Sequence, residues 1–382
     1  MKELVSTFQK CKTPFYWYNM QLLDNTLALI KSESEKYGFH IHYAVKANAN
    51  LPILKKIQGY GFGADCVSGN EVLRSLEAGF SSQNIVFAGV GKSDEEITIG
   101  LENNIFSFNA ESIPELEVIN EIAQKLNKTA KVAIRLNPNV AASTHEYIST
   151  GLNENKFGIN LMEMDEVLNT LAKLDSIEFT GIHFHIGSQI TDLSNFKDLC
   201  HKVNEIQDWF ESKEISLAHI NVGGGLGINY NNPGKDVIPD FKSYFKIFAD
   251  NLKLRADQHL HFELGRSVVG QCGSLITKVL YVKNGVQKKF AIVDAGITEL
   301  IRPALYQALH TLQNISSELP EEKYDVVGPI CESADFFRKD VLLPKTKRHD
   351  FIAIRSAGAY GQVMTSQYNL RRIVDAYYSD KF

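Results

Sequence analysis

The sequence predicts an α/β protein: a (β/α)8 barrel of the TIM type, joined to a second, mostly antiparallel β domain. Three observations support this fold class. Between residues 40 and 266, short β-rich runs alternate with stretches whose apolar residues recur at helical spacing, a pattern typical of βα units and a parallel sheet. Eight such units over roughly 230 residues match a barrel of ordinary size. Beyond residue 266 the alternation stops, and strand-like runs follow one another around turn residues.

The barrel strands are expected, in chain order, at HIHYAVKAN, GADCVS, NIVFAG, IFSFNA, KVAIRLNP, FTGIHFHIGS, HINVGGG and LHFELGR. Helices are expected between them at stretches such as NEVLRSLEAGF, SIPELEVINEIAQKLN, MDEVLNTLAKL and FKDLCHKVNEIQDWF. Together these elements place the barrel at residues 26–264. A doubly wound open sheet built from the same elements is the main alternative.

The second domain is predicted from a change in pattern near the end of the barrel. SLITKVLYVKNGVQKKFAIVDAG contains two strand-like runs on either side of Asn284-Gly285, a dipeptide that strongly favours a hairpin turn. VLLPKTKRHDFIAIRSAG continues in the same style. We therefore expect residues 265–382 to form a β-rich domain, joined by a strand from residues 1–25.

Composition excludes several classes of protein. The 382 residues carry a formal net charge of −5, which gives no indication of a nucleic-acid or membrane-surface partner. Neither a signal-like N-terminus nor an apolar run of membrane-spanning length is present. The five cysteines are odd in number and scattered, and no CxxC pair occurs. Structural disulfides and zinc knuckles are therefore not expected, and the sequence predicts a cytoplasmic protein with reduced thiols.

Polar residues gather at the predicted carboxyl ends of the barrel strands, where βα barrels place their functional groups. These residues are Lys46, Asp65, Ser68, Arg135, Asn137, His183, His185, Gly223 to Gly225, Glu263 and Arg266. Each has an ordinary structural explanation when taken alone, such as a solvated lysine or a buried salt bridge between Glu263 and Arg266. As a set they are too polar for simple packing.

The sequence also contains three HxH pairs: His40/His42, His183/His185 and His259/His261. Side chains two residues apart lie on one face of a strand, so each pair has the spacing of two metal ligands. A metal-dependent barrel hydrolase is therefore an alternative. Core or surface roles are the commoner explanation of an isolated pair.

Lys46, the glycine-rich stretch VGGGLG at 222–227, a flat histidine ring and a lone carboxylate together fit one cofactor, pyridoxal phosphate. The amine forms a Schiff base, backbone N–H groups of the glycine loop hold the phosphate, and an acid pairs with the pyridinium nitrogen. A carboxylate in that place keeps the ring nitrogen protonated, so the ring draws electrons strongly. This electron demand favours decarboxylation.

Ten ordered motifs support a family resemblance: YAVKAN, GADCVSGNE, THEYISTGLNENKFGI, HFHIGSQI, VGGGLG, ELGRSVVGQCG, DAG, LIRPALY, GPICESAD and GAYGQVMTSQYN. Through nearly its whole length the chain resembles the alanine-racemase-like (fold type III) pyridoxal-phosphate decarboxylases, and most closely the diaminopimelate decarboxylases. Two positions depart from the family pattern. Leu264 stands where proline is usual, and Asn70 stands where a second glycine is usual. Neither change removes a catalytic group.

The resemblance implies a role for each matched cofactor residue. Lys46 is implied as the Schiff-base lysine, Asp65 as its support on the barrel floor, His185 as the ring that stacks on the cofactor, and Glu263 as the partner of the pyridinium nitrogen. The remaining residues of the implied cofactor site are Ser188, Gly225, Gly265, Arg266 and Tyr360.

The resemblance also implies a homodimer whose active sites lie at the subunit interface, where Cys331 reaches in from the partner and protonates the substrate carbon. The implied reaction is decarboxylation of meso-2,6-diaminopimelate to L-lysine and carbon dioxide, the last step of lysine biosynthesis, with no metal. The far end of this substrate carries a carboxylate and an ammonium, which suit arginine forks and an acid respectively. The residues expected to bind the substrate are Arg266, Arg302, Tyr306, Glu332 and Tyr360.

Three alternatives accompany this prediction. A carboxynorspermidine-type decarboxylase, or another amino-acid decarboxylase of the same fold, also acts on a substrate with carboxylates and amines. The metal-dependent hydrolase suggested by the HxH pairs is less expected. A non-catalytic regulator that retains the cofactor site is disfavoured by the presence of both Lys46 and Cys331.

Overall fold

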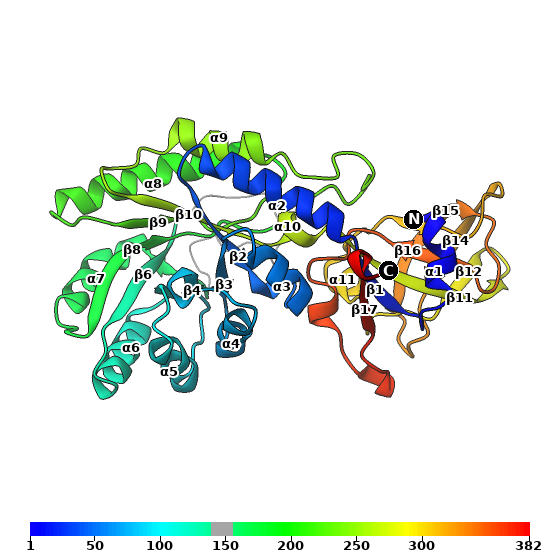
Figure 1. Ribbon diagram of the computed structural model, residues 1–382, viewed down its shortest axis with the longest axis horizontal. Helices are drawn as coiled ribbons and strands as arrows, with labels where there is room; N and C mark the ends of the chain where they lie inside the picture. The colour runs from blue at the N-terminus through cyan, green and yellow to red at the C-terminus, as the bar shows by residue number, and fades with distance from the viewer. Residues whose placement is uncertain (139–155) are drawn as a thin grey trace. The chain divides into compact units, whose positions relative to one another are not determined.

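The computed structural model describes residues 1–138 and 156–382, and Figure 1 traces the chain. The chain divides into two compact units. The barrel unit contains Leu27–Gly227 and Asp240–Gly265, and the β-rich unit contains Met1–Thr26, Ile228–Pro239 and Arg266–Phe382. Of the motif THEYISTGLNENKFGI, only residues 156–159 lie within the described part of the chain.

Residues 228–239 differ from the sequence-based expectation, which places them in the barrel. In the structure they belong to the β-rich unit. Thr311 donates a hydrogen bond to the carbonyl of Tyr230 at 2.8 Å, and Gln271 donates one to the carbonyl of Asn229 at 3.2 Å. The Tyr230 side chain takes part as well, because its hydroxyl accepts a hydrogen bond from Arg266 and its ring centre lies 5.0 Å from that of His310.

Eight parallel strands among the described residues close into a ring in the barrel unit. In ring order they are β2 (His40–Ala44), β3 (Gly63–Cys66), β4 (Ile85–Phe87), β5 (Ser107–Ala110), β6 (Ala130–Asn137), β8 (Ile177–His183), β9 (His219–Asn221) and β10 (His259–Leu264). Strand β10 pairs in parallel with β2 and closes the ring. The predicted barrel is thus confirmed, and the open doubly wound sheet is wrong. The short strand β7 (Ile159–Asn160) pairs with β6.

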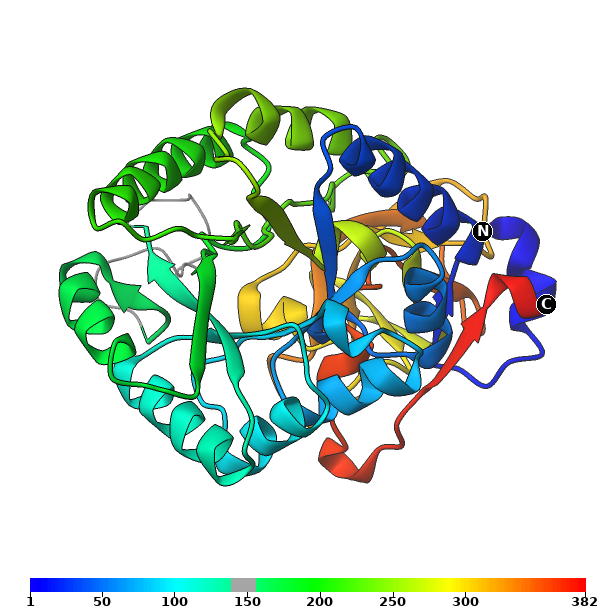
Figure 2. The same cartoon turned by 60° about the vertical axis from the view of Figure 1, so that its left-hand side comes forward.

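Helices of the barrel unit lie outside the ring of strands, as Figure 2 shows. They are α3 (Leu51–Gln58), α4 (Gly69–Glu77), α5 (Asp94–Glu102), α6 (Ile113–Lys125), α7 (Met164–Leu171), α8 (Ser194–Ser212) and α9 (Phe241–Asn251), and α2 (Met20–Glu35) ends in this unit. Serine side chains cap three successive helices: Ser68, Ser93 and Ser112 accept backbone N–H bonds at the starts of α4, α5 and α6. Such caps satisfy N–H groups that the helix leaves unbonded. Ser68, a strand-end residue, therefore has a structural role.

The β-rich unit contains a mixed sheet in which most pairs are antiparallel. Its strands are β1 (Phe15–Tyr18), β11 (Gly273–Asn284), β12 (Lys289–Val293), β13 (Leu312–Asn314), β14 (Glu321–Val327), β15 (Phe336–Pro344), β16 (Phe351–Ile354) and β17 (Asp375–Tyr378), and its helices are α1 (Val5–Phe8), α10 (Arg266–Val269) and α11 (Arg302–Tyr306). The main path runs β13-β16-β11-β12-β14-β15. β1 pairs antiparallel with β11 and parallel with β17. The expected N-terminal strand is confirmed.

The predicted hairpin at Asn284-Gly285 exists, because β11 and β12 pair antiparallel. Its loop is longer than the two residues of the expected turn. Asn284 pairs with Lys289, and the Gly285 N–H donates to the carbonyl of Lys288 at 2.8 Å. None of the helices in residues 1–138 and 156–382 has the length and apolar character needed to cross a membrane.

Candidate active site

Lys46 lies just beyond strand β2, on a one-turn 3-10 helix (Val45–Ala47) rather than on the strand itself. Its Nζ donates to Oδ2 of Asp65 at 2.9 Å. Asp65 is fully buried on the neighbouring strand β3, whereas the Lys46 side chain is 35% exposed. Burial and the nearby charge of Glu263 raise the pKa of Asp65, and the Lys46 ammonium lowers that pKa in part. The two predicted residues are therefore brought together at the carboxyl end of the barrel.

Glu263 lies near the end of β10 and is buried inside the ring. Its Oε1 accepts hydrogen bonds from Asn221 on β9 at 2.8 Å and from Asn109 on β5 at 3.2 Å. Its Oε2 lies 3.0 Å from Nε2 of His183 on β8. Burial alone would raise the pKa of Glu263, but His183 and the Lys46 ammonium outweigh it and hold the pKa well below its ordinary value. The side chain is therefore an ionised carboxylate.

The glycine loop after β9 packs so closely that side chains would not fit. A Cβ on Gly224 would lie 1.9 Å from the carbonyl oxygen of Glu263. Gly223 and Gly225 have φ of +68° and +104°, values that strongly favour glycine. The loop is thereby held against β10 by backbone contacts, as a phosphate cradle built from N–H groups requires.

His185 follows β8 and is half-buried. The Gly224 N–H donates to its Nδ1 at 3.5 Å. Burial, together with the positive charges of Arg135 and Lys46, lowers the pKa of His185 well below its ordinary value. The ring is therefore neutral, which suits stacking on an aromatic cofactor. Ser188 is half-buried on the loop that follows, and Gly265 is buried at the junction between β10 and α10.

Arg135, another strand-end residue, belongs to a buried structural network. Its guanidinium donates to Glu111 at 2.7 Å, and Glu111 also accepts the N–H groups of Gly89 and Gly158. This pair ties together the ends of β4, β5 and β6. Because the Arg135 guanidinium is paired with a buried carboxylate, we assign it a structural role.

A second group of predicted residues lies within the β-rich unit. Arg266 begins α10 and donates to the hydroxyl of Tyr230 at 2.6 Å, and its guanidinium lies 4.8 Å from the ring centre of Tyr360. Arg302 begins α11, and its guanidinium lies 5.4 Å from the ring of Tyr230 and 5.8 Å from that of Tyr306. The sequence did not predict Tyr230 as a site residue, because residues 228–239 were expected to belong to the barrel.

Arg302 is a buried cation with unusual surroundings. It is 6% exposed, and its Nε lies 3.4 Å from Nε2 of His310. Burial lowers the pKa of Arg302, and burial with the charge of Arg302 lowers that of His310 to about 3. Among the described residues no carboxylate forms an ion pair with Arg302. A buried guanidinium without a counter-ion is costly, so this position is suited to an anionic ligand.

Cys331 and Glu332 lie on an exposed loop after β14. The Cys331 N–H donates to the side chain of Asn369 at 3.2 Å, and the Tyr368 hydroxyl donates to Glu332 at 2.8 Å. The other four cysteines are buried, and all five are free thiols. Cys331 is therefore the accessible thiol of the protein.

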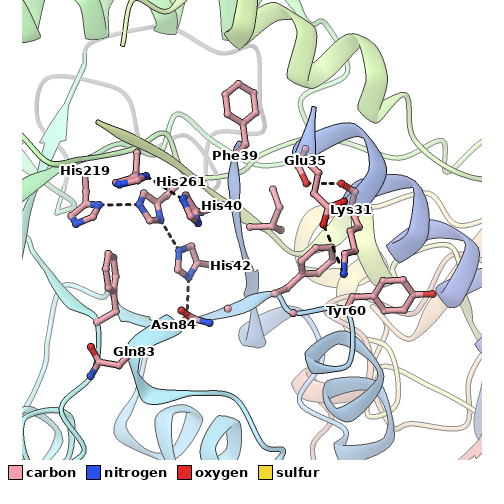
Figure 3. A pocket seen from close by; sticks show the side chains of 17 residues that line it. Lys31, Glu35, Phe39, His40, His42, Tyr60, Gln83, Asn84, His219 and His261 are labelled. Carbon is pink, nitrogen blue, oxygen red and sulfur yellow. Dashed lines mark hydrogen bonds and ion pairs between the residues drawn. The ribbon is translucent and has the colours of Figure 1, made fainter. Parts of the chain in front are cut away.

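The HxH pairs do not meet in one place. His183 contacts Glu263 and His185 contacts the glycine loop, whereas His40, His42, His259 and His261 gather at the opposite, amino-terminal end of the barrel strands (Figure 3). There, with His219, they line a cavity of about 410 Å³. Within the described residues no group of three His, Cys, Asp or Glu side chains has an arrangement that would hold a metal ion.

The histidines of this cavity form an ordered hydrogen-bonded chain. Nδ1 of His42 lies 3.1 Å from the carbonyl of Asn84, so this nitrogen carries a proton. His42 Nε2 is then the acceptor for Nδ1 of His261 at 2.9 Å, and His261 Nε2 accepts from Nδ1 of His219 at 3.1 Å. Burial lowers the pKa of both His42 and His219 to about 4. The chain consists of neutral imidazoles.

Comparison with known proteins agrees with this geometry. The sequence model of a family described as pyridoxal-dependent decarboxylase, pyridoxal binding domain, matches residues 24–270. The diaminopimelate decarboxylase of Bacteroides thetaiotaomicron is 58% identical over 378 residues, 99% of this chain and 98% of that protein. The fold and the strand-end site thus define a pyridoxal-phosphate-dependent decarboxylase.

Solved structures give the same result. A mutant diaminopimelate decarboxylase from Helicobacter pylori, complexed with L-lysine, aligns with a TM-score of 0.93 and 41% identity, covering 99% of this chain and 94% of that chain. The diaminopimelate decarboxylase of M. jannaschii, also with L-lysine, aligns with a TM-score of 0.90 and 34% identity, covering 98% and 89%. The chain belongs to the diaminopimelate decarboxylase family. The resemblance drawn from the motifs is confirmed. The alternative prediction from the HxH pairs, a metal-dependent barrel hydrolase, is wrong.

Proposed function

We propose that this protein decarboxylates meso-2,6-diaminopimelate to L-lysine and carbon dioxide, the last step of lysine biosynthesis. The observation that carries the proposal is the polar end of the barrel, where the Lys46 amine and the ionised, buried Glu263 occur together. Pyridoxal phosphate, when bound, supplies an aldehyde that condenses with amines and a ring that takes up the electron pair left when carbon dioxide departs.

In the proposed cofactor site, each residue has a distinct task. Lys46 supplies the amine that holds the aldehyde, and Asp65 orients that amine. Glu263 would supply a negative charge for the ring nitrogen, and the neutral ring of His185 would stack on the cofactor. Ser188, Gly225 and Gly265 bind the phosphate. The tight packing of the glycine loop and the ionised state of Glu263 support this assignment.

We assign the substrate's distal carboxylate to Arg302, because this buried guanidinium has no carboxylate partner among the described residues. Arg266, Tyr306 and Tyr360 complete the proposed substrate set. A guanidinium matches a carboxylate bidentately, so it favours a substrate with a second acid group over a simple diamino acid. Glu332 is proposed to bind the distal ammonium.

We further propose a cytoplasmic homodimer in which Cys331 and Glu332 of each subunit serve the active site of the other. The exposed position of the loop that carries them supports this arrangement, as does the presence of five unpaired thiols. The Cys331 thiol would deliver a proton to the substrate carbon that loses carbon dioxide.

The test is turnover by the purified protein in the presence of pyridoxal phosphate. Equal amounts of L-lysine and carbon dioxide should form from meso-diaminopimelate, and Lys46→Ala should lose the visible absorbance of the bound cofactor and nearly all activity. Lys125→Ala, an exposed lysine on α6, is the control. Preferential turnover of carboxynorspermidine in a competition assay, or an imine band that survives in Lys46→Ala, would contradict the proposal.

A further inference from the structure

The three side chains that contact Glu263 have a feature that sequence motifs did not reveal. Two of them, Asn109 and Asn221, are neutral amides. Amides donate hydrogen bonds to a carboxylate without neutralising its charge, unlike the Arg135 guanidinium bound to Glu111. A buried carboxylate ordinarily becomes neutral unless such partners stabilise its ionised form. Glu263 thus receives stabilisation while its charge stays available to a ligand.

The orientation of Asn221 is fixed by a second bond. Its Oδ1 accepts the N–H of Gly223 at 2.9 Å, so its Nδ2 must face Glu263. The same amide therefore joins the carboxylate to the first residue of the glycine loop. Asn221 and His183 are 5% and 1% exposed, which shields both bonds from water.

The bonds around Glu263 also leave one lone-pair direction of the carboxylate without a protein donor among the described residues. A carboxylate has about four lone-pair directions, and protein donors occupy three of them among the described residues. Other titratable groups that act on Glu263 are Lys46 and His185, which favour its ionised form, together with His42 on the adjacent strand β2 and Asp65 on the next strand, β3.

We propose that Asn221, Asn109 and His183 are positioning residues that keep Glu263 ionised and direct its one remaining lone pair toward the ring N–H of the cofactor. This inference rests on the proposed role of Glu263 as partner of the pyridinium nitrogen. Asn221 is the residue of choice for the test, because it makes the shortest of the three bonds and also holds the glycine loop.

The first experiment uses the apoprotein, so it is independent of turnover. The carboxyl group of Glu263 is followed by 13C NMR of glutamate-labelled protein, and Glu263→Gln assigns its signal. In the wild type this signal should stay in its ionised position over the whole pH range in which the protein remains folded. In Asn221→Leu the proton affinity of Glu263 should rise about ten-fold or more, because one hydrogen bond to the charged form is lost.

Asn221→Asp and His183→Gln keep the test decisive if Asn221→Leu does not fold. Asn221→Asp is isosteric and places a second carboxylate beside Glu263, so the two should share a proton and the Glu263 signal should titrate at higher pH. His183→Gln retains a donor but removes the imidazole, so the proton affinity of Glu263 should rise less in His183→Gln than in His183→Leu. Asn120→Leu, a buried amide on α6 that binds the Ser176 N–H instead, is the matched control.

The second experiment uses the holoenzyme with 15N-labelled pyridoxal phosphate. The ring nitrogen should be protonated in the wild type and lose that proton at lower pH in Asn221→Leu and Asn221→Asp. The value of kcat should fall about ten- to hundred-fold with little change in KM, because the lost interaction acts on developing charge. Unchanged Glu263 and ring-nitrogen titrations in these variants would overturn the inference. Absence of turnover in the wild type would instead contradict the proposed function and leave the apoprotein titration interpretable.

Discussion

Three buried carboxylates in the barrel unit show how neighbours decide the role of a residue. Glu111 is matched by the Arg135 guanidinium, Asp65 by the Lys46 amine, and Glu263 by amides and an imidazole. The first is neutralised and structural, while the other two mark the site. The partners of Glu263 come from β5, β8 and β9, far away in the sequence. Asn109 and Asn221 therefore look like ordinary strand residues until the barrel is closed.

Arg302 offers a prediction at the same scale. Arg302→Leu should lower kcat/KM for meso-diaminopimelate by about a hundred-fold or more, because a carboxylate would lose its buried, charged partner. The same change should leave the melting temperature of the apoprotein equal or higher, because it removes a buried cation that lacks a counter-ion. Steady-state kinetics and thermal unfolding of the apoprotein measure the two effects.

The control for Arg302 is Arg348→Leu, which removes an exposed guanidinium that stacks on Tyr281 in the same unit. Arg348→Leu should change neither kcat/KM for meso-diaminopimelate nor the melting temperature of the apoprotein by much. A clear loss of apoprotein stability in Arg302→Leu, with kinetics intact, would show that Arg302 has a structural role and no part in substrate binding.

At the scale of elements, the alternation of strands and helices in the sequence was sufficient to predict the barrel, and Asn284-Gly285 was sufficient to predict a hairpin. Three local features were not predictable. Lys46 lies on a 3-10 turn, the hairpin loop has extra residues, and residues 228–239 associate with the β-rich unit. The first two depend on backbone hydrogen bonds, which side-chain periodicity does not record. The third depends on contacts of residues 229 and 230 with residues far away in the sequence.

The glycine loop provides a prediction for this scale. A methyl group on Gly224 would lie 1.9 Å from the Glu263 carbonyl, so Gly224→Ala must displace the loop from β10. We expect the free energy of unfolding to fall by about 1–3 kcal/mol and the affinity for pyridoxal phosphate to fall about ten-fold or more. Denaturant unfolding and cofactor titration measure the two changes.

Gly91→Ala is the matched control in the barrel unit. No atom outside its chain neighbours lies within 4 Å of a Cβ placed there, and its φ is not in the left-handed region. Its stability and cofactor affinity should match the wild type. Equal cofactor affinity in Gly224→Ala and Gly91→Ala would rule out a phosphate-binding role for this loop.

At the scale of the whole molecule, the histidine cavity predicts acid sensitivity. The pKa of His42 is lowered to about 4 from its ordinary 6.5, so below pH 6.5 the unfolded chain binds this proton and the folded chain does not. Stability is therefore full above pH 6.5 and declines as the pH falls toward 4. His42 alone should lower the free energy of unfolding by about 2 kcal/mol between about pH 7 and 5. Urea unfolding at the two pH values measures this change.

The His42→Gln variant should lose part of this pH dependence, because glutamine retains a hydrogen-bonding side chain but does not titrate. His201→Gln, an exposed position on α8, should retain all of it. If the wild-type protein had the same unfolding free energy at about pH 7 and pH 5, the neutral state assigned to the histidine chain would be contradicted.

The proposed dimer leads to a complementation experiment. Lys46→Ala and Cys331→Ala should each be nearly inactive alone, because each removes a catalytic group from every site. When the two proteins are dissociated and reassembled together, mixed dimers should regain about a quarter of the wild-type activity, since one of their two sites is intact in half of the dimers. Recovery that never exceeds the two separate baselines would show that Lys46 and Cys331 of one site come from the same subunit.

The placement of β1 has a consequence for how the chain is made. This strand, FYWY, is wholly buried between β11 and β17, yet both of those strands leave the ribosome long after it does. At ordinary translation speeds of about 5–20 residues per second, the delay is on the order of tens of seconds. During that interval the four aromatic residues of β1 lack the strands that bury them in the folded protein. The nascent chain should therefore depend on chaperones more than a chain whose strands pair in the order of their synthesis.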